Sequence, residues 1–147
     1  MSDSVQIVCG RCGQINRLPA GRTPAAARCG KCHAPIFDGH PVAVDEQAFG
    51  RHVSHSSVPV LVDVWAPWCG PCRAMAPMFE RAAAELEPDV RLLKLNSDEA
   101  PGVSARFGIR SIPTLLLLQR GREVARVSGA TDSQGIVVWT RAALGKT

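Results

Sequence analysis

Residues 42–144 alternate between two spacings of apolar residues, one typical of strands and one typical of helices. Short runs of β-branched and aliphatic residues predict strands, and apolar residues three or four positions apart predict helices. The expected strands are 42–44, 59–66, 90–96, 114–119 and 123–129; the expected helices are 45–53, 71–87, 101–108 and 132–144. Strands that alternate with helices predict an α/β domain, with a mixed sheet covered on both faces.

Residues 1–37 lack such a pattern and contain few large apolar side chains. These are Val5, Ile7, Val8, Ile15, Leu18, Ile36 and Phe37. So small a core does not hold a fold by itself, which suggests a metal staple. The segment "FDGHP" at 37–41 is typical of a turn or linker. We therefore expect a small unit at 1–37, a linker at 38–41 and a larger domain at 42–147.

Charge and composition narrow the class of protein. The net charge is +4, and residues 1–45 and 46–147 each contribute +2 (five against three, and twelve against ten, charged residues). Without a basic tail, neither nucleic acid nor a membrane is an expected partner. The N-terminus lacks a signal-peptide pattern, and the longest apolar run, at 115–118, is far shorter than the ~20 residues that span a bilayer. These features predict a cytoplasmic protein, in which paired cysteines are more often metal ligands or redox catalysts than structural disulfides.

All six cysteines fall in three Cys-Gly-x-Cys turns, and two of these turns predict a metal site. Cys9 and Cys12 are separated by sixteen residues from Cys29 and Cys32, a spacing typical of a tetrahedral zinc site with four thiolate ligands. The alternatives are two redox disulfides or free thiols, and His33 and His40 are possible substitute ligands. A role in stabilising the fold is favoured over a nucleic-acid-binding ribbon, because basic and aromatic residues do not cluster here.

The third turn, "CGPC" at 69–72, follows an apolar strand and opens a helix. Unpaired N–H groups and the positive end of the helix dipole lower the pKa of a thiol at Cys69. Pro71 fits the first turn of a helix, where a missing N–H costs nothing. We therefore predict a redox dithiol, with an exposed attacking sulfur at Cys69 and a better covered one at Cys72. Half of a second metal site is the alternative, but no further Cys-x-x-Cys pair remains to complete it.

Asp63 is a candidate acid-base group. Strand alternation places it on the same face as Leu61 and Trp65, so burial should raise the pKa of its carboxyl group and make it a proton acceptor near neutral pH. A solvated aspartate on an open face is the alternative. Lys94 is either a charge partner of Asp63 or an exposed lysine.

These motifs resemble the thioredoxin family. "DVWAPWCGPCRAMAP" is similar to the family's active-site strand and helix start, "FGIRSIPTLLLLQRG" to the segment with its cis-proline, and "VSGA" to the glycine turn beside the substrate groove. The four-cysteine segment ahead of them resembles the ribbon of the zinc-containing bacterial thioredoxin 2 subfamily. The resemblance covers essentially the whole chain. It implies the thioredoxin fold, a mixed central sheet flanked by helices, with a small N-terminal zinc ribbon.

The resemblance also implies residue roles. Cys69 would be the nucleophile and Cys72 the resolving thiol, with Asp63 as the buried acid-base group, Lys94 beside it and Pro113 as the cis-proline facing the dithiol. The implied groove for an extended substrate segment is lined by Trp68, Gly70, Pro71, Ile112, Gly129 and Ala130. Two departures are small: Val64 stands where an aromatic residue is common, and Pro67 lies between the tryptophans.

The expected function is reduction of disulfides in target proteins, with one structural zinc ion per chain and a redox-active Cys69–Cys72 disulfide. The resemblance implies re-reduction by thioredoxin reductase, an NADPH-dependent flavoprotein, and we expect a monomer. One alternative is a disulfide oxidant or isomerase, which an export signal would have favoured. Another is a zinc-ribbon adaptor or redox-switched chaperone, for which an intact set of Asp63, Cys69, Cys72 and Pro113 is unnecessary.

Overall fold

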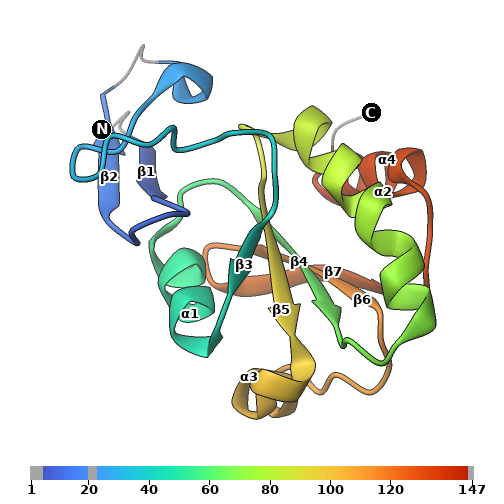
Figure 1. The fold of residues 1–147 in the computed structure, drawn as a ribbon. Helices are drawn as coiled ribbons and strands as arrows, with labels where there is room; N and C mark the ends of the chain where they lie inside the picture. Colours follow the sequence, from blue (N-terminus) through green and yellow to red (C-terminus); the bar gives the residue numbers. More distant parts are fainter. Residues whose placement is uncertain (1–4, 20–22, 146–147) are drawn as a thin grey trace.

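A computed structural model of the chain describes residues 5–19 and 23–145. A two-stranded antiparallel ribbon, β1 (Val5–Val8) and β2 (Ile15–Leu18), precedes a five-stranded sheet. In Figure 1 this ribbon lies at one end of the sheet, beyond α1. No helix among the described residues is long and apolar enough to cross a membrane.

The sheet has the order β3-β5-β4-β6-β7. Its strands are β3 (Val42–Val44), β4 (Val60–Trp65), β5 (Arg91–Asn96), β6 (Thr114–Gln119) and β7 (Arg122–Ser128). β3 and β4 pair with β5 in parallel, whereas β6 pairs antiparallel with both β4 and β7. The predicted mixed sheet is therefore confirmed, and its central strand β4 is almost completely buried, as expected for a strand that is apolar except at Asp63.

Helices cover both faces of the sheet (Figure 1). α2 (Gly70–Leu86) and α4 (Ser133–Ala143) pack on one face against Leu61, Leu92, Leu115 and Leu117. α1 (Glu46–His55) and α3 (Pro101–Arg106) pack on the other face against Val62, Val64, Leu93, Leu95 and Leu116. Successive residues of a strand point to opposite faces, so each buried strand supplies apolar side chains to both cores.

Local chemistry fixes where the helices begin and end. The side chains of Asp45 and Asp132 cap α1 and α4 by accepting hydrogen bonds from Ala48 N and Gly135 N, both at 2.8 Å. α2 ends at Leu86, ahead of Pro88, as predicted. The peptide bond before Pro88 is cis, a feature that the sequence did not reveal.

The hairpin of β1 and β2 was missed by the sequence analysis, which recognised only cysteine turns in this region. Both strands have just four residues, "VQIV" and "INRL", too few for a convincing alternation of apolar and polar positions. In the structure their apolar side chains form a separate core with Cys9, Cys29, Ile36 and Phe37. The ribbon also bonds to the larger domain: Gln6 N donates to Ser57 Oγ at 2.8 Å, and Ser57 N donates to Gln6 O at 2.7 Å.

Candidate active site and metal centre

The dithiol lies at the start of α2, just beyond the carboxyl end of β4. Cys69 and Cys72 form a disulfide, with their Cα atoms 5.2 Å apart. Cys69 is the N-cap residue of α2, and its Sγ accepts a hydrogen bond from Cys72 N at 3.2 Å. Gly70 and Pro71 complete the first turn and are exposed. The positive end of the helix therefore faces the Cys69 sulfur, which favours its thiolate form.

The two sulfurs are covered to nearly the same extent. Cys69 is 5% exposed and Cys72 is 2% exposed. The predicted order of burial is correct, but the prediction that Cys69 is exposed is wrong. Ala66, Trp65 and Ile112 pack around the disulfide, and the sequence around the turn did not reveal that coverage.

A loop carrying Ile112 and Pro113 faces the disulfide. The Ile112–Pro113 peptide bond is cis, the form that the family resemblance implied, and Cys69 Sγ lies 3.9 Å from Ile112 O. Gly129, in the turn after β7, donates its N–H to Pro113 O at 2.9 Å and has a φ of 103°, a left-handed conformation that favours glycine. Ala130 follows it and is exposed.

Trp68 stands next to the dithiol with 68% of its surface exposed. Its indole Nε1 donates to the carboxylate of Asp98, at 3.0 Å and 3.2 Å. Sequence reasoning missed Asp98 as a site residue, because it lies thirty positions from Trp68 and no local pattern connects them. The bond fixes one end of an otherwise exposed indole ring, directly before Cys69 in the chain.

Asp63 lies on β4, on the sheet face covered by α2. It is 1% exposed, and neither carboxyl oxygen has a hydrogen-bond partner among the described residues. Burial raises the pKa of Asp63 to about 7, while the charge of Lys94 acts in the opposite direction. Lys94 is directly opposite Asp63 on β5, and its Nζ lies 5.2 Å from the centre of the Trp65 ring. The alternative of a solvated aspartate is thus excluded.

The other four cysteines come together at the tips of two turns in the ribbon. Their Sγ atoms all lie within 4.8 Å of one another, and the Cys9–Cys32 and Cys12–Cys29 distances are both 3.6 Å. Tetrahedral zinc with Zn–S bonds of about 2.3 Å needs sulfurs roughly 3.8 Å apart. The four thiols therefore fit a zinc ion with a complete shell. In the described part of the chain, this cluster includes no histidine.

His33 contributes its backbone rather than its ring to this geometry. Gly13 and His33 each follow the second cysteine of a turn and have positive φ angles of 80° and 66°. His33 therefore adopts the left-handed conformation that a glycine provides in the first turn. The ring of His40, the other possible substitute ligand, pairs with Glu80.

The metal-type turns and the redox turn differ in how the first sulfur is stabilised. In each metal-type turn, the backbone N–H two positions after the first cysteine donates to its sulfur. Arg11 N lies 3.4 Å from Cys9 Sγ, and Lys31 N lies 3.4 Å from Cys29 Sγ. Pro71 occupies the corresponding position after Cys69 and has no N–H to give, so the bond comes from the next residue, Cys72. The proline thus excludes the metal-type turn and is compatible with a helix start.

Comparisons with known proteins agree with this division into two sites. A family model described as Thioredoxin matches residues 40–142, and a model described as Thioredoxin 2, N-terminal matches residues 8–34. The chain belongs to the thioredoxin family. With its Cys69–Cys72 disulfide, it is a protein-disulfide oxidoreductase, and the second match identifies its N-terminal unit as the thioredoxin 2 zinc ribbon.

Named thioredoxins align with most of the chain. Thioredoxin C-3 from Corynebacterium nephridii is 42% identical over 133 residues, which cover 90% of this chain and 91% of the relative. The chloroplastic M-type thioredoxin of Chlamydomonas reinhardtii is 41% identical over 123 residues, covering 82% and 88%. Thioredoxin 1 from Synechococcus elongatus is 49% identical over 88 residues, covering 60% and 82%.

Proposed function

We propose that this thioredoxin reduces disulfides in target proteins, with Cys69 as the nucleophile and Cys72 as the resolving thiol. The observation that carries the proposal is the position of the Cys69 sulfur at the N-terminus of α2, where Cys72 N donates to it. That environment favours a thiolate on Cys69, and the thiolate is the form that attacks a disulfide.

In the first step, the Cys69 thiolate attacks one sulfur of the target disulfide. A mixed disulfide forms, and the second target sulfur leaves as a thiolate. Cys72 then loses its proton to Asp63, through water, and attacks Cys69 Sγ. This breaks the mixed disulfide and releases the first target sulfur as a thiolate. Two electrons pass from the dithiol to the target, and Cys69–Cys72 ends as a disulfide.

Asp63 suits this proton transfer because its pKa of about 7 lies close to the working pH, the condition for an efficient general base. Lys94 is the neighbouring charge that keeps this pKa from rising further. The unpartnered, buried carboxyl group is the group that would receive the proton.

The proposed substrate groove is lined by Trp68, Gly70, Pro71, Ile112, Gly129 and Ala130, with Pro113 facing the dithiol. Support comes from the exposed indole of Trp68 and from the bond between Gly129 and Pro113, which brings the two loops together. An extended segment of the target would lie there, with its disulfide against Cys69. We further propose that thioredoxin reductase, an NADPH-dependent flavoprotein, restores the dithiol, and that the protein acts as a cytoplasmic monomer.

We assign one zinc ion to Cys9, Cys12, Cys29 and Cys32, in a ribbon at residues 1–37 joined by a linker at 38–41 to the thioredoxin domain at 42–147. A metal with four thiolate ligands has no open coordination position, so it supplies folding energy rather than catalysis. The separate apolar core of the ribbon and the start of β3 at Val42 support these boundaries.

NADPH-coupled reduction of insulin, combined with zinc quantification, tests both assignments. Cys69→Ser should lose insulin reduction and retain zinc, whereas Cys9→Ser should lose zinc and retain the redox dithiol. Full activity of Cys69→Ser, or loss of zinc from it, would overturn the division between the two sites.

A further inference from the structure

Arg91 is a buried cation at the contact between the ribbon and the thioredoxin domain. It is the first residue of β5 and is 1% exposed. Its Nη2 donates to Val8 O and to Ile36 O, both at 2.9 Å, and its guanidinium lies 4.3 Å from the centre of the Phe37 ring. All three partners belong to the ribbon, although Arg91 belongs to the sheet of the other domain.

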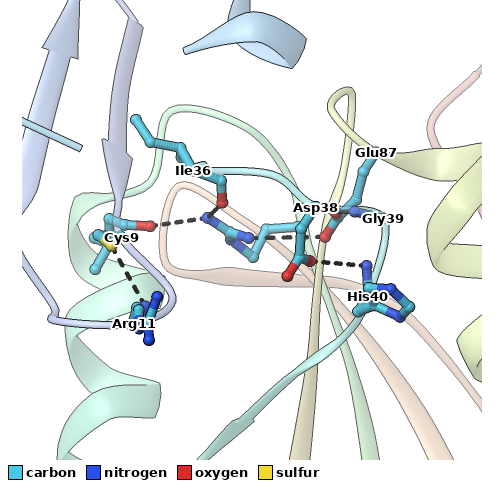
Figure 2. A network of polar contacts seen from close by, with 9 residues as sticks. Cys9, Arg11, Ile36, Asp38, Gly39, His40 and Glu87 are labelled. Carbon is cyan, nitrogen blue, oxygen red and sulfur yellow. Dashed lines mark hydrogen bonds and ion pairs between the residues drawn. The ribbon is translucent and has the colours of Figure 1, made fainter. Parts of the chain in front are cut away.

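Glu87, at the end of α2, completes the network. Its Oε2 lies 3.7 Å from Arg91 Nη1, and the two side chains are only 2% and 1% exposed. Its Oε1 accepts a hydrogen bond from Gly39 N, in the linker, at 3.1 Å. Figure 2 shows this network, with Ile36, Gly39 and Glu87 labelled. A buried ion pair of this kind is stable only while its hydrogen-bond partners remain in place.

The two carbonyl groups that Arg91 binds lie on the two segments that carry the cysteine turns. Val8 directly precedes Cys9 and belongs to β1. Ile36 follows the second turn, and its N–H bonds to Ala27 O at 3.0 Å, just before Cys29. One guanidinium therefore joins the chain segments on which the two buried cysteines, Cys9 and Cys29, are held.

The negative charge of the four-thiolate zinc site favours a cation such as Arg91 close to it. Four thiolates and one Zn²⁺ carry a formal charge of −2, and Cys9 and Cys29 are each only 1% exposed. Groups around the ligands orient them and tune their affinity for the metal, commonly by 10- to 100-fold. Arg91 supplies a positive charge, a bond to Val8 O directly before Cys9, and a bond to Ile36 O on the segment that pairs with Ala27, two residues before Cys29.

We propose that Arg91, a residue of the thioredoxin domain, is a positioning residue of the metal site. The proposal rests on the zinc assignment made above. Docking of the thioredoxin domain then strengthens zinc binding, and by thermodynamic reciprocity zinc stabilises the thioredoxin domain. The ribbon and the domain thus form one thermodynamic unit, because Arg91 loses two buried carbonyl partners when the ribbon unfolds.

Zinc affinity of the full-length chain is the first test, measured by competition with a chromogenic chelator. Arg91→Met should weaken zinc binding at least tenfold, and Arg91→Lys, which keeps the charge without the planar fork, should be intermediate. Arg81→Met, on the exposed surface of α2, is the matched control and should leave affinity unchanged. Wild-type zinc affinity in a folded Arg91→Met protein would overturn the proposal.

A second measurement uses only the wild-type protein and remains decisive if Arg91→Met does not fold. Trp65, Trp68 and Trp139 all lie in the thioredoxin domain, so tryptophan fluorescence reports its unfolding. Removing zinc under reducing conditions should lower the thermal midpoint of this signal by several degrees. An unchanged midpoint would refute the coupling. A chain that takes up no zinc at the outset would instead refute the metal assignment.

Discussion

The carboxyl group of Asp63 is buried between the sheet and α2, without a hydrogen-bond partner among the described residues. Its pKa is raised to about 7. A carboxyl group with a higher pKa in the folded chain binds protons more tightly when folded. Its contribution to stability is complete below about pH 4 and is lost as the pH rises through about 7. At higher pH the folded chain therefore holds a buried, unfavourable charge.

Asp63→Asn removes this ionisation, so the oxidised variant should be more stable than the oxidised wild type above pH 7. The difference should grow between pH 4 and pH 8 and reach at most on the order of 4 kcal/mol, since one pKa unit corresponds to about 1.4 kcal/mol. Urea unfolding at several pH values measures it. Parallel pH dependence of the two proteins would show that Asp63 has an ordinary pKa.

The two cysteines of the dithiol should give opposite results when each is replaced. In Cys72→Ser, the Cys69 thiolate still attacks a target but no thiol remains to resolve the mixed disulfide. This variant should accumulate a covalent complex with a disulfide-containing protein, visible on a non-reducing gel and lost on reduction. Cys69→Ser should form far less complex, because only the Cys69 sulfur lies at the N-cap of α2, where its thiolate is favoured. Equal trapping by both variants would contradict the assigned roles.

For single residues, the sequence predicted the environment correctly where neighbours along the chain determine it. Burial of Asp63 followed from strand alternation, and the dithiol at a helix start followed from the apolar strand before it. Coverage of Cys69 by Ile112 and the bond from Trp68 to Asp98 depend on segments 30 or more residues away. No local pattern contains that information.

Among the structural elements, the loop at 107–113 is held by side chains on β6 and β7. Thr114 Oγ1 donates to Ser111 O at 2.6 Å. Arg126 donates to Phe107 O and, through Nη1, to Gly108 O at 3.5 Å. Its guanidinium is oriented by Glu123, with bonds of 2.6 Å and 2.7 Å. Arg126 therefore satisfies carbonyl groups at the end of α3 and fixes the start of the loop that faces Cys69.

Arg126→Met should loosen this loop and weaken the binding of extended protein substrates. We expect KM for insulin to rise about three- to tenfold with little change in kcat, because uniform binding energy is lost. The rate with a small aromatic disulfide, which needs little of the groove, should stay unchanged. Arg122→Met, on the same strand, serves as the control. A fall in kcat without a change in KM would show that Arg126 does not act through substrate binding.

Whether a helix or strand could be predicted from the sequence depended on its length and on how regularly its apolar residues recur. Strands and helices of the thioredoxin domain were predicted from apolar runs and spacings, with ends shifted by a few residues. The four-residue strands β1 and β2 were missed because each is too short to show a convincing alternation of apolar and polar positions, and their pairing forms across the turn that carries Cys9 and Cys12.

Across the whole molecule, the ribbon contact at Arg91 and the dithiol lie at opposite ends of two parallel strands. Arg91 begins β5 beside the ribbon, whereas the dithiol follows the carboxyl end of β4. The six residues of β5 separate these ends by roughly 17 Å, at about 3.3 Å per residue. Metal-dependent stability therefore need not change the chemistry at Cys69, since the apolar cluster around the disulfide includes no ribbon residue that the structure describes.

Zinc removal should accordingly lower thermal stability while leaving the reaction of each folded molecule nearly unchanged. At a temperature where circular dichroism shows the metal-free protein to be folded, its rate of insulin reduction should remain within about twofold of the zinc-loaded rate, a barrier change of ~0.4 kcal/mol. We expect this small effect because the apolar cluster around the disulfide includes none of the ribbon residues that the structure describes. The same comparison on Cys9→Ser controls for effects of the chelator. A rate change of tenfold or more in the folded, metal-free protein would mean that the ribbon acts on the dithiol itself.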